Sequence, residues 1–79
     1  MDTAEKRYGE ALKKARARVG ISQEELADRA DVHASYVSQL ERGIKSPTLG
    51  VMLRLAGALG LPAADLLRET EQEYLRRRK

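Results

Sequence analysis

Cysteine, tryptophan and phenylalanine are absent from this chain of 79 residues, which also has only two prolines and one histidine, His33. Without cysteine the chain forms no disulfide and offers no thiolate to a metal ion. A single histidine argues against a histidine-based metal site, and we expect no cofactor. The sequence also lacks a Ser-His-Asp set and a phosphate-cradling glycine loop, so we expect that the protein is not an enzyme.

Long apolar segments are missing as well. No run approaches the roughly 20 apolar residues that cross a bilayer, and no signal-peptide apolar region is present. These absences predict a soluble, cytoplasmic protein without a membrane partner. The net charge of +3 says little, because removing the four basic residues 76–79 from the total of 15 leaves 11 against 12 acidic residues. A nucleic-acid partner must therefore be argued from where the charges lie.

The residues that are present favour helices. Hydrophobic residues make up 42% of the chain, which is typical of a folded protein, and they are mainly Ala and Leu. The length suits one small domain, residues 1–79, which would bury about 60% of its unfolded surface. We expect an all-α, compact five-helix bundle with its core at about residues 8–67 and a C-terminal helix or tail at 68–79.

Five helices follow from the apolar spacing and from the signals at their ends. Gly20, Gly43 and Gly60 occupy positions where left-handed residues end helices. Ser22 and Thr48 are expected N-caps, with Ser22–Glu25 as a reciprocal capping box. The expected helices cover about 3–18, from 22 to 30, 33–43, 48–60, and from Pro62, in the first turn, to a charged, frayed end at 76–79. Their apolar stripes contain Tyr8, Leu12, Ala15, Val19, Leu26, Ala27, Ala30, Val32, Val37, Leu40, Leu49, Met52, Leu53, Ala56 and Leu59.

The third helix has an unusual surface. Charged residues form 34% of the chain, yet residues 32–40 contain none. At 100° per residue, Val37 and Leu40 face the core, whereas Ser35 and Gln39 point away from it. Only residues 30–33 separate this helix from the one before it, so the two must meet at a sharp angle. Two short helices joined in this way form a helix-turn-helix.

The motifs now support a resemblance to a known family. "GISQEELADRADVHASYVSQLERG" and "SPTLGVMLRLAGALGLPAADLL" resemble, in order and spacing, the phage repressor/Cro (XRE) type of helix-turn-helix protein over about Tyr8–Leu67. The chain departs from that pattern at Asp31, where the family often has glycine, and at His33, where it favours a Ser or Thr cap. Asp tolerates left-handed geometry, so we expect the turn to form.

The resemblance implies that the third helix enters the major groove of double-stranded DNA. Gln pairs with adenine, Ser pairs with several bases and Ala contacts the thymine methyl group. The alternative is that these are tolerated surface residues, and that His33 is only an N-cap. The implied base contacts are Gln39, Ser35, Ser38, Ala34 and His33.

The resemblance also implies contacts with the phosphate backbone. Helix N-termini and basic residues beside the third helix suit phosphate, whereas the alternative for each is a solvated surface side chain. Arg16 is expected to pair with Glu41, and Gln23 to brace the third helix. Tyr36 is expected to pack partly against the core. The implied phosphate contacts are Gln23, Arg42, Lys45, Ser22, Arg16, Tyr36 and Ser46.

Members of the family usually bind inverted half-sites as dimers, so we expect a homodimer formed through the last helix. The alternative is that Leu66 and Leu67 close the core. The expected function is a transcriptional regulator of the small-repressor or restriction–modification controller type. An antitoxin that also binds a toxin, or a protein–protein adaptor, is the competing interpretation. The expected interface residues are Leu61, Leu66, Leu67, Tyr74 and Leu75.

Overall fold

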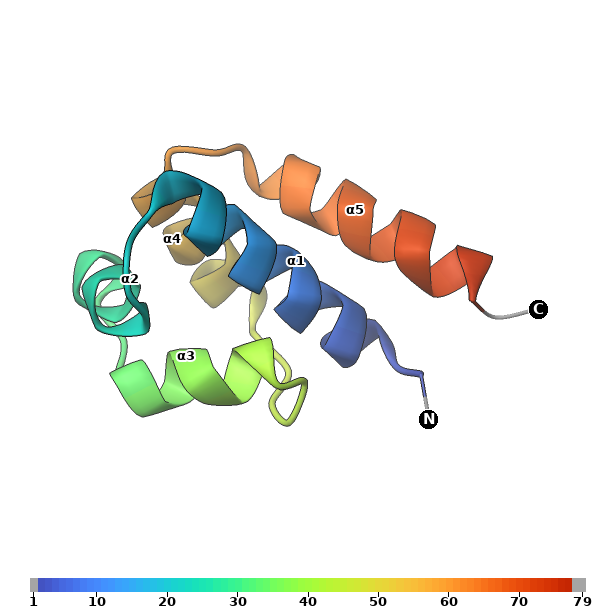
Figure 1. Ribbon diagram of the computed structural model, residues 1–79, viewed down its shortest axis with the longest axis horizontal. Helices are drawn as coiled ribbons and strands as arrows, with labels where there is room; N and C mark the ends of the chain where they lie inside the picture. The colour runs from blue at the N-terminus through green and yellow to red at the C-terminus, as the bar shows by residue number, and fades with distance from the viewer. Residues whose placement is uncertain (1, 78–79) are drawn as a thin grey trace.

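Five helices occur in the expected order in the computed structural model, which describes residues 2–77 (Figure 1). No strand is present in that part of the chain. The expected all-α bundle is therefore confirmed. The helices are α1 (Ala4–Val19), α2 (Gln23–Ala30), α3 (Ala34–Glu41), α4 (Leu49–Leu59) and α5 (Ala63–Arg76).

Most of the residues that were expected to cap the helices do so in the structure. Gly20 and Gly60 are left-handed, with φ of 85° and 73°, and the side chains of Ser22 and Thr48 each accept a backbone N–H bond. The expected Ser22–Glu25 capping box is half formed: Ser22 Oγ accepts from the Glu25 N–H, whereas the Glu25 carboxylate accepts hydrogen bonds from Arg29. Helix α5 begins one residue after Pro62, which is its N-cap.

The turn between α2 and α3 depends on Asp31. This residue adopts the left-handed conformation, with φ 59° and ψ 50°, and is the non-glycine residue with positive φ within residues 2–77. Its backbone conformation lets the Val32 N–H donate to the Ala27 carbonyl at 2.9 Å. Val32 then packs against the core. The predicted tolerance of Asp at this position is confirmed, and the chain turns sharply enough for α3 to cross α2.

The core lies among α1, α2, α3 and α4, with α5 adding Leu66. Most of the predicted stripe is buried, but three positions were wrong: Val19, Leu49 and Leu53 are exposed. Val19 is the last residue of α1, beyond the packed turns. On α4, Leu55 and Ala56 face the core, so the wide apolar face of this helix extends beyond the area that its neighbours cover.

Helix α1 lies between α3 and α5 (Figure 1). Helix α5 runs back along one side of α1, α3 lies on the other side, and both ends of the chain are at the same end of the molecule. Within residues 2–77 no single helix is long and apolar enough to cross a membrane; α4 and α5 together meet that test, but the chain bends by 111° between them.

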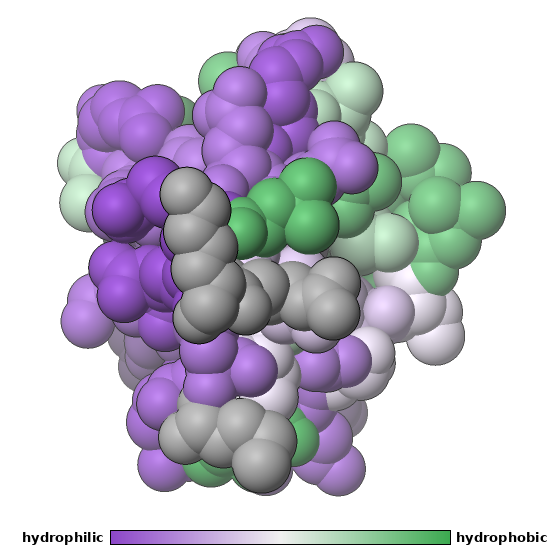
Figure 2. All heavy atoms as spheres, turned by 90° about the vertical axis from the view of Figure 1, so that its right-hand side faces the viewer, coloured by the Kyte–Doolittle hydropathy of each residue, from purple (hydrophilic) through white to green (hydrophobic). Residues whose placement is uncertain are grey.

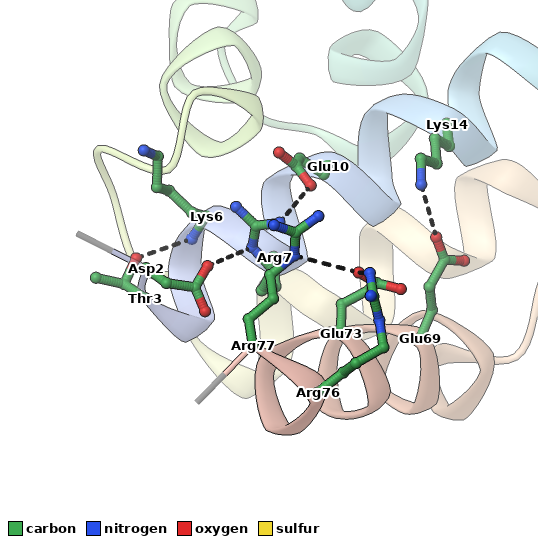
Figure 3. Close-up of polar contacts among 10 residues, drawn as sticks. All are labelled: Asp2, Thr3, Lys6, Arg7, Glu10, Lys14, Glu69, Glu73, Arg76 and Arg77. Atoms are coloured by element: carbon green, nitrogen blue, oxygen red, sulfur yellow. Dashed lines mark hydrogen bonds and ion pairs between the residues drawn. The ribbon is translucent and has the colours of Figure 1, made fainter. Parts of the chain in front are cut away.

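Ion pairs gather where the start of α1 meets the end of α5 (Figure 3). The buried Arg7 contacts Asp2 at 2.7 Å and Glu10 at 3.0 Å. On α5, Glu73 accepts from Arg76 and Arg77, and the Arg76 hydrogen bond is the main cause that lowers the pKa of Glu73. In the segment 76–79, which was expected to be frayed, Arg76 is the last residue of α5 and Arg77 is its C-cap, whereas Arg78 and Lys79 lie outside the described residues.

Candidate nucleic-acid interface

A clamp formed by α1, α2 and α3 fixes the position of the third helix. The Arg16 guanidinium donates to both carboxylate oxygens of Glu41, from Nε at 2.7 Å and from Nη2 at 3.0 Å. The Gln23 amide donates to Glu41 Oε1 at 2.9 Å. The expected Arg16–Glu41 pair and the bracing by Gln23 are both confirmed. Three segments distant in sequence therefore meet at one carboxylate at the end of α3.

The clamp is largely removed from water, because the side chains of Glu41 and Arg16 are 3% and 16% exposed. The hydrogen bond to Glu41 raises the pKa of Arg16, so the guanidinium remains charged. Its Nη1 donates to the Ile21 carbonyl at 2.9 Å. The sequence interpretation missed this second partner of Arg16, since backbone acceptors leave no pattern in a sequence. A bidentate pair of this kind holds one geometry rather than many.

The surface of α3 that points away from the clamp is polar and uncharged. Ser35 is exposed, and Ser38 and Gln39 are half-buried. Their spacing of three and four residues places them on one face of the helix, with Arg42 following at the end. This arrangement presents hydroxyl and amide groups from a rigidly held helix.

The start of α3 is less open than its middle. Ala34 and Tyr36 are half-buried and pack against the core, which confirms the partly structural placement of Tyr36. His33 is exposed and occupies the N-cap position, but its side chain makes no capping hydrogen bond. The imidazole therefore does not cap the N-terminus of α3.

Cations border the polar face. Arg42 and Lys45 are exposed, and within residues 2–77 neither forms an ion pair. Ser46 is exposed in the loop after α3, and Ser22 is exposed at the N-terminus of α2. The free N–H groups of that N-terminus add a positive end of a helix dipole. The surface around α3 is thus suited to anionic groups.

The five expected interface residues do not share one environment. Leu66 is 3% exposed and belongs to the core, whereas Leu67 and Leu75 are 51% and 53% exposed. Leu61 and Tyr74 are half-buried. Leu67 and Leu75 line a groove of about 340 Å³ between α5 and the start of α1, together with Ala4, Thr70, Glu71 and Tyr74. Hydrophobic side chains gather beside a largely hydrophilic surface where the molecule is viewed from the end that carries both termini (Figure 2).

The sequence match to known proteins agrees with this geometry. The helix-turn-helix family model matches residues 12–66, and the chain therefore belongs to the helix-turn-helix family of DNA-binding transcriptional regulators, of the XRE type. It is 34% identical to the control protein C.BamHI of Bacillus amyloliquefaciens, over 76% of this chain and 75% of that protein. It is also 34% identical to an uncharacterised regulator, y4dJ, of Sinorhizobium fredii, over 85% of this chain and 87% of that protein.

Solved structures of related proteins have the same fold. A crystal structure of the clp gene regulator ClgR of Corynebacterium glutamicum superposes with a TM-score of 0.88 at 33% identity, covering 92% of this chain and 94% of the chain in that structure. The restriction–modification controller protein C.AhdI of Aeromonas hydrophila gives a TM-score of 0.78 at 35% identity, covering 78% of this chain and 90% of C.AhdI.

Proposed function

We propose that this regulator binds a specific double-stranded DNA sequence by placing α3 in the major groove. The observation that carries the proposal is the uncharged polar face of α3, held by the Arg16–Glu41 clamp and bordered by cations that form no ion pair within residues 2–77. Ser35 and Gln39 are the principal base contacts, with Ser38 beside them and Ala34 and His33 at the first turn. Gln39 is suited to adenine and the serines to several bases.

Phosphate contacts surround this face. Arg42 and Lys45 neutralise phosphates, because they are exposed and have no acidic partner in the described residues. Ser22 and Gln23 at the start of α2, and Ser46 after α3, donate to the backbone in addition. Arg16 retains one unused N–H on each terminal nitrogen after its three hydrogen bonds, and the Tyr36 hydroxyl completes the set.

The protein acts as a homodimer on inverted half-sites about one helical turn, roughly 34 Å, apart. The apolar surface of α5, where Leu67, Tyr74 and Leu75 line one groove, supplies the interface together with Leu61 in the turn before α5. Leu66 supports that surface from within the core. A small repressor or a controller of a restriction–modification system is the role that this arrangement and the relatives support.

Selection from random duplexes tests the proposal. We expect an inverted repeat whose half-site centres are about 10 base pairs apart, with an affinity that falls by a log–log salt slope of about −0.9 for each phosphate neutralised. Selection of unrelated duplexes, or binding that does not depend on salt, would reject DNA reading and favour a protein–protein adaptor. Selection of a single half-site would reject the dimer alone.

A further inference from the structure

Gly9 lies in the middle of α1, is buried, and precedes the residues 12–66 that match the family model. Glycine is one of the least favourable residues inside a helix, so its presence needs a physical reason. The two glycines inside α4 serve as a comparison: apart from its chain neighbours and the nearby backbone of α4, a Cβ built on Gly50 or Gly57 would meet no atom of residues 2–77 within 4 Å. A Cβ on Gly9 has no such space.

The obstacle to a side chain at Gly9 is the backbone of α3. A Cβ on Gly9 would lie 2.7 Å from the Glu41 carbonyl oxygen and 2.9 Å from the Glu41 carbonyl carbon, and closer still to the Leu40 carbonyl oxygen. Real Cβ atoms do not approach other atoms so closely. Because these are backbone atoms within a helix, they cannot move away by a change of rotamer. The end of α3 therefore rests directly on α1, with no side chain between them.

Two neighbouring contacts bind the same end of α3 to the same side of α1. Arg16, seven residues after Gly9, holds the Glu41 side chain, and seven residues are about 10 Å along a helix. One turn before Gly9, Lys6 packs under Gly43, where a Cβ would lie 2.8 Å from the Lys6 Cα. The backbone contact at Gly9 thus lies between the clamp and the loop after α3.

We propose that Gly9 is a positioning residue that sets the tilt of α3, and through it the direction in which Gln39 points toward the bases. This inference rests on the proposed function. A side chain at position 9 lifts the C-terminal end of α3, whereas the N-terminal end remains held by the short turn at Asp31. Gln39, two residues from Glu41, is displaced more than Ser35.

The test compares Gly9→Ala with Gly57→Ala, which is a matched control because both replace a glycine inside a helix. Gly57→Ala should raise the Tm by several degrees through helix propensity and leave DNA recognition unchanged. Gly9→Ala should remain folded and lower the ratio of specific to non-specific affinity at least tenfold. Non-specific binding, which depends on Lys and Arg, should stay within about twofold.

Base selectivity separates positioning from a general loss of structure. We expect Gly9→Ala to relax the same base pair that Gln39→Ala relaxes, and the base pairs near Ser35 to remain selected. A folded variant with an unchanged affinity ratio would overturn the proposal, as would relaxation spread equally over the half-site. If Gly9→Ala unfolds, the measurements are repeated in the Gly57→Ala background; unfolding there too would assign Gly9 to the fold as a whole.

Failure of the proposed function has a different signature. If the unmodified protein selects no duplex, DNA reading is rejected, and the positioning of α3 is then followed by amide chemical shifts. Gly9→Ala should change the shifts of residues 38–43 more than those of α2. Shift changes spread evenly over all helices would overturn the positioning role independently of DNA.

Discussion

Helices α3 and α5 lie on opposite sides of α1 and are held to it in different ways (Figure 1). Helix α3 has only eight residues, yet its end is fixed by a buried bidentate ion pair. Helix α5 has fourteen residues but buries only Leu66 and Thr70, and Glu69 reaches Lys14 and Arg18 at 3.8 Å in exposed pairs. Directional bonds suit a helix that must point its side chains accurately, whereas an exposed apolar helix suits association with another surface.

The largest expected effect follows from breaking the clamp of α3. Glu41→Ala leaves Arg16 charged and without its partner in a poorly solvated site, and breaking a buried pair in this way costs about 3–5 kcal/mol. Urea unfolding monitored by circular dichroism should show this decrease in the free energy of unfolding. A loss below about 1 kcal/mol would contradict the stabilising role of the clamp.

A pH effect should arise at Tyr8, beneath the apolar surface near α5. Its hydroxyl is buried without a hydrogen-bond partner in the described residues, and burial raises its pKa to about 12. Between pH 10 and 12 the unfolded chain releases this proton while the folded protein keeps it. The contribution of Tyr8 to the free energy of unfolding is therefore fully present below pH 10, and it decreases by about 1.4 kcal/mol per pH unit between pH 10 and pH 12.

The Tyr8→Phe variant isolates this contribution from the lysines that titrate in the same range. It should unfold with a weaker pH dependence than the unmodified protein above pH 10, and it should be as stable or more stable at pH 7 because no unpaired hydroxyl remains. Identical pH profiles for the two proteins would show that the Tyr8 hydroxyl is solvated.

Association through α5 is tested by replacing its exposed leucines. Leu67→Ser with Leu75→Ser should weaken the dimer by about 2 kcal/mol, or roughly 30-fold in Kd, because both side chains lose apolar burial. Sedimentation velocity measures this change. Val19→Ser, at a comparably exposed apolar position on α1, is the control and should leave the dimer intact. Equal weakening by both would place the interface elsewhere.

Reading of the bases is tested on the outer face of α3. Gln39→Ala should cost about 1–3 kcal/mol on the selected duplex and relax the choice at one base pair. Arg42→Ala should weaken binding to all duplexes alike and reduce the salt slope by about one unit. Fluorescence anisotropy titrations at several salt concentrations measure both variants. If Arg42→Ala weakened binding to only one duplex sequence, Arg42 would be a base contact and not a phosphate contact.

The smallest effect is expected for the ion pairs that Glu69 of α5 forms with α1. Glu69→Ala removes the pairs with Lys14 and Arg18, but an exposed pair of this kind contributes only about 0–1 kcal/mol. Urea unfolding under the conditions used for Glu41→Ala should detect almost no change. A decrease in the free energy of unfolding as large as that of Glu41→Ala would show that ion pairs hold α5 to α1 as strongly as they hold α3.

Much of the fold and part of the site could be predicted from local sequence. Gly20, Ser22 and Thr48 act on backbone groups within four residues, so their roles needed no knowledge of the rest of the molecule. The Arg16–Glu41 pair joins residues 25 positions apart and was reached through family resemblance, not from spacing. The exposure of Leu49 and Leu53 was missed, because periodicity identifies an apolar face but not how much of it a neighbour covers.

The sequence by itself determined the number of helices, several of their caps, the sharp turn at Asp31 and the polar face of α3, because these depend on backbone geometry and side-chain periodicity over a few residues. Only the tertiary structure decided that Arg16 also binds the Ile21 carbonyl, that Leu66 is buried while Leu67 is exposed, and that Gly9 touches the backbone of α3. The physical reason is that burial and close approach depend on which helices pack together, and that packing joins residues far apart in the chain.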